Sequence, residues 1–416
     1  MPTLALNGGS PVRSRSFSAW PVWDDDEVTA IAEVVRSGHW GLPRGRQVGA
    51  LEGEFARFHD ASFGVAVPSG TAALELALRA CEVGLGDEVI TSPYTFIATV
   101  SSIFHAGAVP VFVEIDPLTF NLDPDGIESA LSPYTKAIMP VHIAGCPADL
   151  DAVLAIAQRH NLHVIEDASQ AHGARWRGQS TDGEPRGVGA IGQCGTFSFQ
   201  STKNLNCGEG GLLLTNDERL FERAFAHHYV GGRRDGSRSE PPLLGTNLRM
   251  TEFQAALLRS QMRRLPGQIA LREANATFLA DELRKLGVES QRRDSRVATH
   301  AWHLFIMRYQ ADLFAGASRE QFLRALRAEG IPCSSGYTPL WRDEVWQHDE
   351  HVRRVLARHP RRVDLAGCNL PVCERVCREE AVWLTQNLLL GDRHDMNDIV
   401  AAVAKLRAHA DEIKHS

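Results

Sequence analysis

The chain has 416 residues, of which 44% are hydrophobic and 23% charged, and its formal net charge is -7 at pH 7. These values are typical of a globular protein with one large domain and a smaller one. Acidic and basic residues are interspersed, so the charge gives no reason to expect a nucleic acid or an anionic membrane as partner.

The sequence also gives no sign of membrane insertion or export. No apolar stretch approaches the roughly 20 residues that a membrane-spanning helix needs. The N-terminal segment has no basic region followed by a long apolar core, so we expect no signal peptide. We therefore expect a cytoplasmic protein.

Two local clusters resemble binding sites, but simpler interpretations are favoured. The basic residues between 353 and 362 are typical of a solvated helix face that ends in a turn at Pro360. Cys368, Cys373 and Cys377 lack the spacing of a zinc site, and no fourth ligand is evident. We interpret them as free thiols and expect no metal.

From about residue 51 to 215, short apolar runs alternate with helical patterns. Several runs are continuously apolar and rich in β-branched residues, which is typical of strands covered on both faces of a sheet. The predicted helices span 71–81, 96–107 and 150–160, and the predicted strands span 63–67, 88–91, 109–113, 137–141, 162–166, 195–199 and 211–215. Strands that alternate with helices predict a largely parallel sheet.

The C-terminal part has a different pattern. A helical pattern over 251–265 is interrupted by Pro266 and resumes to about Leu286. A strand over 302–309, a helix over 318–330 and a final amphipathic helix over 396–413 follow. We predict an α/β domain with a mainly parallel seven-stranded sheet in residues 1–265. A smaller C-terminal α+β domain is predicted in residues 266–416.

The turn at 69–71 joins the first predicted strand to the first predicted helix. Helix N-termini present unpaired N–H groups and the positive end of the helix dipole, which favours a phosphate. A helix cap with a glycine in a tight turn explains the same residues without a ligand. A dinucleotide is less favoured, because no G-x-G-x-x-G follows the strand.

Glu166 and Asp167 lie where another predicted parallel strand ends, the edge at which open α/β sheets bind ligands. A carboxylate there can keep a ring nitrogen protonated, as pyridoxal phosphate requires. The alternative is an acidic helix cap. His172 is open to two interpretations, a ligand or base and a hydrogen-bonded structural histidine.

Lys203 lies in a loop between two predicted strands, among glycines and small polar residues. A lysine in such a loop is usually only a solvated charge. Here one α/β domain combines it with a phosphate-binding turn and an acid at a strand end. Together these features provide an amine, a partner for a ring nitrogen and phosphate donors, as a Schiff-base cofactor enzyme needs.

Motifs along nearly the whole chain resemble those of the DegT/DnrJ/EryC1/StrS family of sugar aminotransferases, which are fold-type I pyridoxal-phosphate enzymes. Their order along the chain is also that of the family. The motifs are SGTAAL (69–74), SPYTFIAT (92–99), PVHIAG (140–145), EDASQAHGA (166–174), FSFQSTK with GEGG (197–211), GTNLRMTEFQAA (245–256) and GYTPL (336–340).

The resemblance implies roles for individual residues around the pyridoxal ring. Lys203 would be the Schiff-base lysine and would carry a proton between substrate and cofactor. Asp167 would pair with the pyridinium nitrogen, and Gln170 would lie near the ring hydroxyl. Phe96 would stack on the ring face.

The resemblance likewise implies a phosphate site. Gly70, Thr71 and Ser198 would hold the phosphate within one chain. Asn247 would reach the phosphate of a neighbouring subunit. The resemblance therefore implies a homodimer with shared active sites.

Two positions indicate the branch of the family. Gln200 and Ser201 stand where many sugar aminotransferases have His-Pro, which is more similar to scyllo-inosose aminotransferases and 3-amino-5-hydroxybenzoate synthases. Family members that act as 3-dehydratases have histidine in place of the lysine. The presence of Lys203 therefore favours a transaminase or another lysine-dependent reaction.

We expect an aminotransferase that moves an amino group from glutamine or glutamate to the ketone of a cyclitol or keto sugar, in antibiotic or other secondary metabolism. The alternatives are a 3-amino-5-hydroxybenzoate synthase-like dehydratase and aromatase, a non-catalytic cofactor-binding regulatory partner, and a nicotinamide-dependent sugar oxidoreductase. Residues that could select the ketone include Trp40, Arg44, Arg233, Arg234 and Tyr337.

Overall fold

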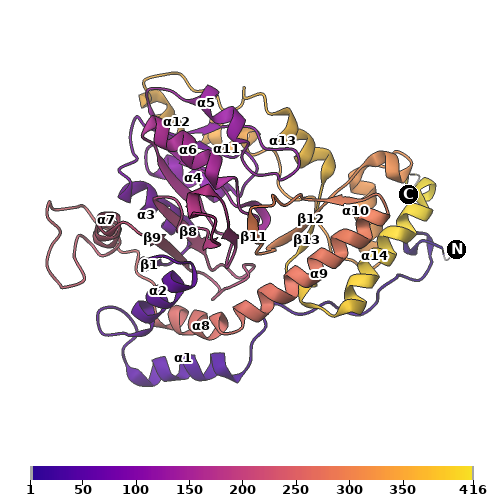
Figure 1. The fold of residues 1–416 in the computed structure, drawn as a ribbon, viewed down its shortest axis with the longest axis horizontal. Helices are drawn as coiled ribbons and strands as arrows, with labels where there is room; N and C mark the ends of the chain where they lie inside the picture. Colours follow the sequence, from indigo (N-terminus) through magenta and orange to yellow (C-terminus); the bar gives the residue numbers. More distant parts are fainter. Residues whose placement is uncertain (1–2, 415–416) are drawn as a thin grey trace.

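A seven-stranded mixed sheet lies inside the larger lobe of the computed structural model, which describes residues 3–414 (Figure 1). The strand order is β1-β9-β8-β5-β4-β2-β3, and only β9 runs antiparallel to its neighbours. The strands are β1 (Phe63–Val67), β2 (Glu88–Thr91), β3 (Val109–Phe112), β4 (Thr135–Met139), β5 (His163–Asp167), β8 (Cys194–Ser198) and β9 (Gly211–Thr215). The prediction of a mainly parallel seven-stranded sheet is confirmed.

Helices cover both faces of this sheet, which explains why its strands are continuously apolar. The three predicted helices are present as α3 (Gly70–Ala80), α4 (Ile97–His105) and α6 (Leu150–His160). Leu74 of α3 and Ile103 of α4 pack on one face, and Val153 of α6 packs on the other. Further helices not predicted from the sequence are α1 (Asp25–Ser37), α2 (Gln47–Phe58), α5 (Ile127–Ala130) and α7 (Glu218–His228).

The long helical pattern after residue 250 forms two helices, α8 (Glu252–Met262) and α9 (Leu265–Lys285). The interruption was predicted at Pro266, but the break lies at residues 263–264. Pro266 stands in the first turn of α9, where a missing N–H group needs no intrahelical partner. The proline therefore begins the second helix instead of ending the first.

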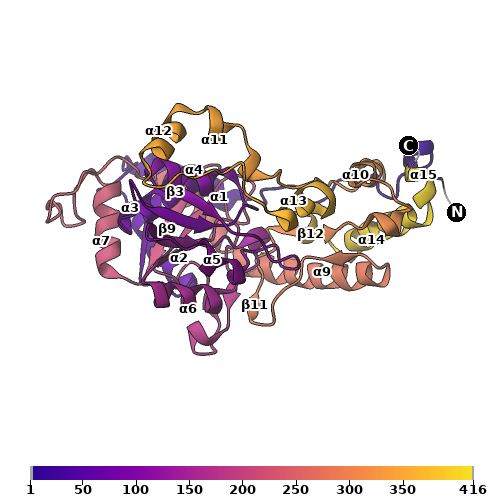
Figure 2. The same cartoon turned by 90° about the horizontal axis from the view of Figure 1, so that it is seen from above.

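A second, antiparallel sheet consists of β10 (Glu289–Ser290), β12 (Leu304–Arg308) and β13 (Ala381–Thr385). It packs with α9, α10 (Arg319–Ala328), α14 (Arg393–Ala408) and α15 (Ala410–Lys414) around one apolar cluster. α10, α14 and α15 lie at the end of the molecule opposite α7 (Figure 2). The predicted strand over 302–309 begins later than expected, because the backbone at Trp302 has a positive φ of 52°.

The smaller elements connect the two sheets. β6 (Arg175–Trp176), β7 (Arg186–Gly187) and β11 (Val297–Thr299) form a short third sheet. α11 (Val345–His348), α12 (Glu350–Arg358) and α13 (Pro371–Arg375) belong to a segment that packs against α4 and β3. Leu4, from the other end of the chain, packs into the cluster around β12. The segment with α11, α12 and α13 thus packs against the large domain predicted in residues 1–265, and Leu4 packs against the predicted small domain. The domain division at residue 265 stays a prediction.

No helix in the described residues is both long and apolar enough to span a bilayer.

Candidate functional site

A cavity of about 640 Å³ lies at the carboxyl ends of β1, β2, β5 and β8. Ligands bind at this edge in open α/β sheets. Residues from the second sheet close its other side. Its lining includes Ser69–Thr71, Thr95, Phe96, Thr99, Asp167, Ser169, Gln170, Ser198, Gln200, Thr202, Lys203, His303, Tyr337, Trp383, Thr385 and Gln386.

The turn between β1 and α3 forms one wall of the cavity. Ser69 caps α3, because its Oγ accepts a hydrogen bond from Ala72 N at 3.1 Å. A Cβ on Gly70 would lie 2.6 Å from Ser198 Cβ, so only glycine allows β8 to approach the start of the helix. The Ser198 hydroxyl accepts from Gln200 N at 3.3 Å and retains its own hydrogen to donate. The wall therefore presents helix-terminal N–H groups and hydroxyls to the cavity, as an anion site requires.

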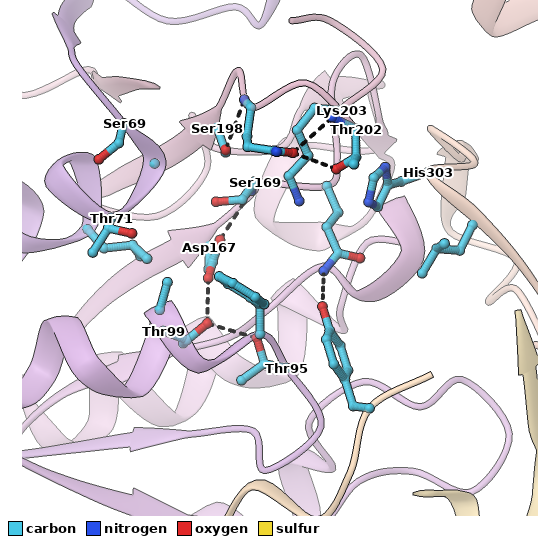
Figure 3. A pocket seen from close by; sticks show the side chains of 18 of the residues that line it. Ser69, Thr71, Thr95, Thr99, Asp167, Ser169, Ser198, Thr202, Lys203 and His303 are labelled. Carbon is cyan, nitrogen blue, oxygen red and sulfur yellow. Dashed lines mark hydrogen bonds between the residues drawn. The ribbon is translucent and has the colours of Figure 1, made fainter. Parts of the chain in front are cut away.

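Asp167 ends β5 and is 4% exposed. Its Oδ2 accepts a hydrogen bond from Thr99 Oγ1 at 2.8 Å, and its Oδ1 accepts from Ser169 N at 3.1 Å. Thr99 is itself hydrogen-bonded to Thr95 Oγ1 at 2.8 Å (Figure 3). These bonds fix the carboxylate at the cavity wall, so that it can hold a protonated ring nitrogen.

Glu166, the other acid of this strand end, has a structural role. It accepts hydrogen bonds from the N–H groups of Gly189, Ile191 and Gly192 and interacts with His142 Nε2 at 3.0 Å. Burial favours its neutral form, but the hydrogen bonds outweigh burial and lower the pKa of Glu166. It does not line the cavity.

Lys203 extends into the cavity from the loop between β8 and β9 (Figure 3). Backbone hydrogen bonds hold this loop, among them Lys203 N to Gln200 O at 2.9 Å and Ser201 N to Gly208 O at 2.9 Å. Burial lowers the pKa of the Lys203 amine to about 8, while the charge of Asp167 acts in the opposite direction. Within residues 3–414 the amine has no carboxylate in ion-pair contact. A substantial fraction is therefore neutral and nucleophilic near pH 8.

Phe96 and Gln170 complete the predicted set within one chain. Phe96 lines the cavity and leaves 57% of its surface exposed, so a ring face is available for stacking. Gln170 Oε1 accepts from Ala144 N at 2.8 Å, and its Nε2 donates to Tyr337 Oη at 3.1 Å. The structure thus brings together seven of the eight predicted site residues, Gly70, Thr71, Phe96, Asp167, Gln170, Ser198 and Lys203.

Asn247 is the predicted site residue that does not line the cavity of its own chain. It forms a bridge with Tyr229 after α7, and its Oδ1 accepts from Arg249 N at 3.4 Å. Among the residues considered for ketone selection, only Tyr337 lines the cavity.

Two histidines near the lysine have different positions. His172 is buried behind the wall, where its Nε2 donates to Ser198 O at 2.8 Å, so it is the hydrogen-bonded structural histidine. His303 lines the cavity, and its Nδ1 contacts Asn204 Oδ1 at 3.2 Å. Burial lowers the pKa of both rings well below the usual value, so both are neutral.

Sequence reasoning missed His303, Thr99 and Gln386 as cavity residues. Thr99 ends the SPYTFIAT motif, and its spacing of about one helical turn from Thr95 is the signal that connects it to the cavity. His303 and Gln386 come from the second sheet, far along the chain from the motifs around Lys203. No local pattern connects them to the cavity.

In the described part of the chain, no group of three or more His, Cys, Asp or Glu side chains is arranged to hold a metal ion. Cys373 and Cys377 are buried free thiols, and Cys368 is a partly buried one.

The chain is similar to known proteins over its full length. The chain is 40% identical to an L-glutamine:2-deoxy-scyllo-inosose aminotransferase of Streptoalloteichus tenebrarius, over 99% of both chains. It is 37% identical to the enzyme of that name from Micromonospora echinospora, over 100% of both.

Solved structures agree with this similarity. A crystal structure of 3-amino-5-hydroxybenzoic acid synthase has a TM-score of 0.82 and 33% identity, covering 95% of this chain and 100% of that one. An aminotransferase from Psychrobacter cryohalolentis has a TM-score of 0.84 and 33% identity, with the same coverage. The fold-type I prediction is thereby confirmed. Because the model of the DegT/DnrJ/EryC1/StrS aminotransferase family matches residues 21–388, the chain belongs to this family and is an aminotransferase.

Proposed function

We propose that the protein is a pyridoxal-phosphate-dependent aminotransferase that transfers the amino group of glutamine to the ketone of a cyclitol related to scyllo-inosose. The observation that carries the proposal is the single cavity that joins a buried amine, a fixed carboxylate and a phosphate-binding turn. The names of the full-length relatives support glutamine as donor and an inosose as acceptor. Glutamate is the alternative donor, and a keto sugar is the alternative acceptor.

The cavity residues fit the cofactor in chemistry. Lys203 would hold its aldehyde carbon, and Asp167 its ring nitrogen. Phe96 would cover a ring face, and Gln170 would lie near the ring hydroxyl. The phosphate would occupy the turn in which a Cβ on Gly70 would meet Ser198, with the helix N-terminus and the Thr71 hydroxyl as further donors.

When bound, the cofactor supplies the electron sink that makes the Cα–H bond of the amino donor acidic. Lys203 Nζ would take the proton and return it, because burial lowers the pKa of the amine to about 8 and makes its neutral form far more accessible than in an exposed lysine. Asp167 is held in place by its bond from Thr99 and would keep the ring nitrogen protonated.

We further propose a cytoplasmic homodimer with shared sites. Asn247 lies outside its own cavity, which is consistent with a role toward a second subunit. Mixing Lys203→Ala with Asn247→Ala subunits tests this arrangement. Complementation would restore activity in the mixture, whereas independent subunits would show none.

The experiment that tests the function incubates the cofactor-loaded protein with glutamine and 2-deoxy-scyllo-inosose and identifies the product by mass spectrometry. The expected product is the aminocyclitol, with Lys203→Ala as an inactive control. Formation of no amine with either glutamine or glutamate would contradict the proposal. An aromatic product from an amino-keto cyclohexene would favour the synthase alternative.

A further inference from the structure

The guanidinium of Arg272, on α9, is buried without a counter-charge. The residue is 0% exposed, and no carboxylate of residues 3–414 lies within ion-pair distance of it. Its Nε donates to Gln386 Oε1 at 3.1 Å, and its Nη2 donates to the same oxygen. Its Nη1 is buried without an acceptor. Burial lowers the pKa of Arg272 to about 9, so the group is still charged at neutral pH.

An unpaired buried charge is costly, and proteins normally pair such groups or leave them at functional sites. Several other arginines of this chain have a carboxylate partner, and the fully buried side chain of Arg13 pairs with Asp395 and Asp398 at 2.7 Å. Arg264 pairs with Glu27, and Arg296 pairs with Asp149 at 2.6 Å. Arg272 donates to one neutral amide and lies 5.4 Å from the centroid of the Trp20 ring, and neither partner carries a negative charge. An anion from outside the chain would supply the missing charge.

Gln386 connects this charge to the cavity. It is 3% exposed and lines the cavity. Because two N–H groups of Arg272 converge on Oε1, the orientation of the amide is fixed. Its Nε2 has no acceptor within residues 3–414 and remains available as a donor to a ligand in the cavity.

The position of Gln386 follows from the second sheet. Thr385 pairs with Leu304, so Gln386 lies beside His303. His303 is across the cavity from Thr71 (Figure 3). The charge of Arg272 reaches this part of the cavity, because it acts together with burial and with the charge of Lys203 to lower the pKa of His303.

We propose that Gln386, oriented and polarised by Arg272, binds the α-carboxylate of the amino donor on the His303 side of the cavity. The identity of this anion rests on the proposed function. The cyclitol ketone carries no charge, and the phosphate of the cofactor has its own turn around Gly70. Glutamine has one carboxylate, which lies on the carbon that bears the transferred amine. Gln386 is thus the contacting residue and Arg272 a positioning residue.

Two unreactive ligands test the proposal without transamination. Glutaramate is glutamine without its amine, and pentanediamide replaces its carboxylate with a neutral amide. Calorimetry with the cofactor-loaded protein should show about tenfold tighter binding of glutaramate, because a charge-assisted bond is lost in the diamide. In Arg272→Met the ratio of the two affinities should fall to about one. A merely structural role of Arg272 would weaken both ligands and leave the ratio unchanged.

A second variant and a matched control keep the result interpretable. Gln386→Glu is isosteric and gives Arg272 an internal counter-charge, so it should fold and also lose the preference for glutaramate. Asn275, one turn further along α9, is equally buried and donates to Leu389 O at 3.0 Å and Gly391 O at 2.9 Å. Asn275→Ala disturbs the same helix contact away from the cavity and should keep the tenfold ratio.

Two results would overturn the carboxylate site. One is the absence of a preference for glutaramate in the parent protein, and the other is a preserved preference in both Arg272→Met and Gln386→Glu. The proposed function has a separate readout, the consumption of glutamine. A protein that binds glutaramate more tightly than pentanediamide but does not consume glutamine would refute the proposed function. It would not contradict the carboxylate site.

Discussion

Replacing Lys203 with methionine should stabilise the cofactor-free protein, most strongly at neutral pH. Burial lowers the pKa of this amine from 10.5 to about 8. Each pKa unit corresponds to about 1.4 kcal/mol, so the shift corresponds to about 3 kcal/mol. This is an upper limit, because the residue is only partly buried and solvent screens part of the effect.

The pH dependence has a definite sign. Between about pH 8 and pH 10.5 the unfolded chain holds the proton of this lysine, whereas the folded chain releases it. The parent protein therefore gains stability as pH rises through this window, and the full cost of the charged amine is present below pH 8. The advantage of Lys203→Met should accordingly decrease from about 3 kcal/mol at pH 7 toward a small, pH-independent difference.

Urea unfolding of both proteins at pH 7 and pH 10, followed by circular dichroism, measures the effect. Lys285→Met is the matched control, because that lysine is 68% exposed and pairs with Glu282 on the surface. It should change stability little at either pH. Equal stability of parent and Lys203→Met at pH 7, or an advantage that grows with pH, would refute a buried Lys203 amine with a depressed pKa.

Two further predictions concern the remaining cavity walls. Thr99→Val removes the hydroxyl that donates to Asp167. The loss should lower the free energy of unfolding by about 1–3 kcal/mol and speed the loss of cofactor on dialysis. Unchanged retention of the cofactor by the variant would argue against a role for this bond. Gly70→Ala should weaken the binding of pyridoxal phosphate at least tenfold in an equilibrium titration, because the added Cβ would meet Ser198. Gly49→Ala is the control and should bind the cofactor normally, because a Cβ at that position has no atom within 4 Å. Equal affinities of the two alanine variants would contradict the proposed phosphate site.

Much of the fold was predictable because its signals are local. The strands of the large sheet are continuous apolar runs, and the residues of the turn before α3 are typical of a helix cap. α1 was missed although Asp24 and Glu27 form a capping box at its start. Its apolar pattern is weak, since the exposed residues of this helix include Val28 and Val35.

The candidate site was predictable only in part, for a physical reason. Asp167 and Lys203 stand at strand ends or in a loop within recognisable motifs, and a parallel sheet brings such positions to one edge. Arg272 and Gln386 carry no local signal. An arginine in a helical pattern is normally solvated, and its burial follows only from the packing of α9 against the second sheet.

We propose that Lys203 is the amine that holds pyridoxal phosphate for amino transfer. The most direct measurement is the visible absorbance of the cofactor-loaded protein before and after glutamine is added, in the parent and in Lys203→Ala. The parent should show the band of the lysine-bound cofactor, and glutamine should remove it. Lys203→Ala should lack this band after free cofactor is removed. A parent protein without the band, or a variant in which the band persists unchanged, would contradict the account.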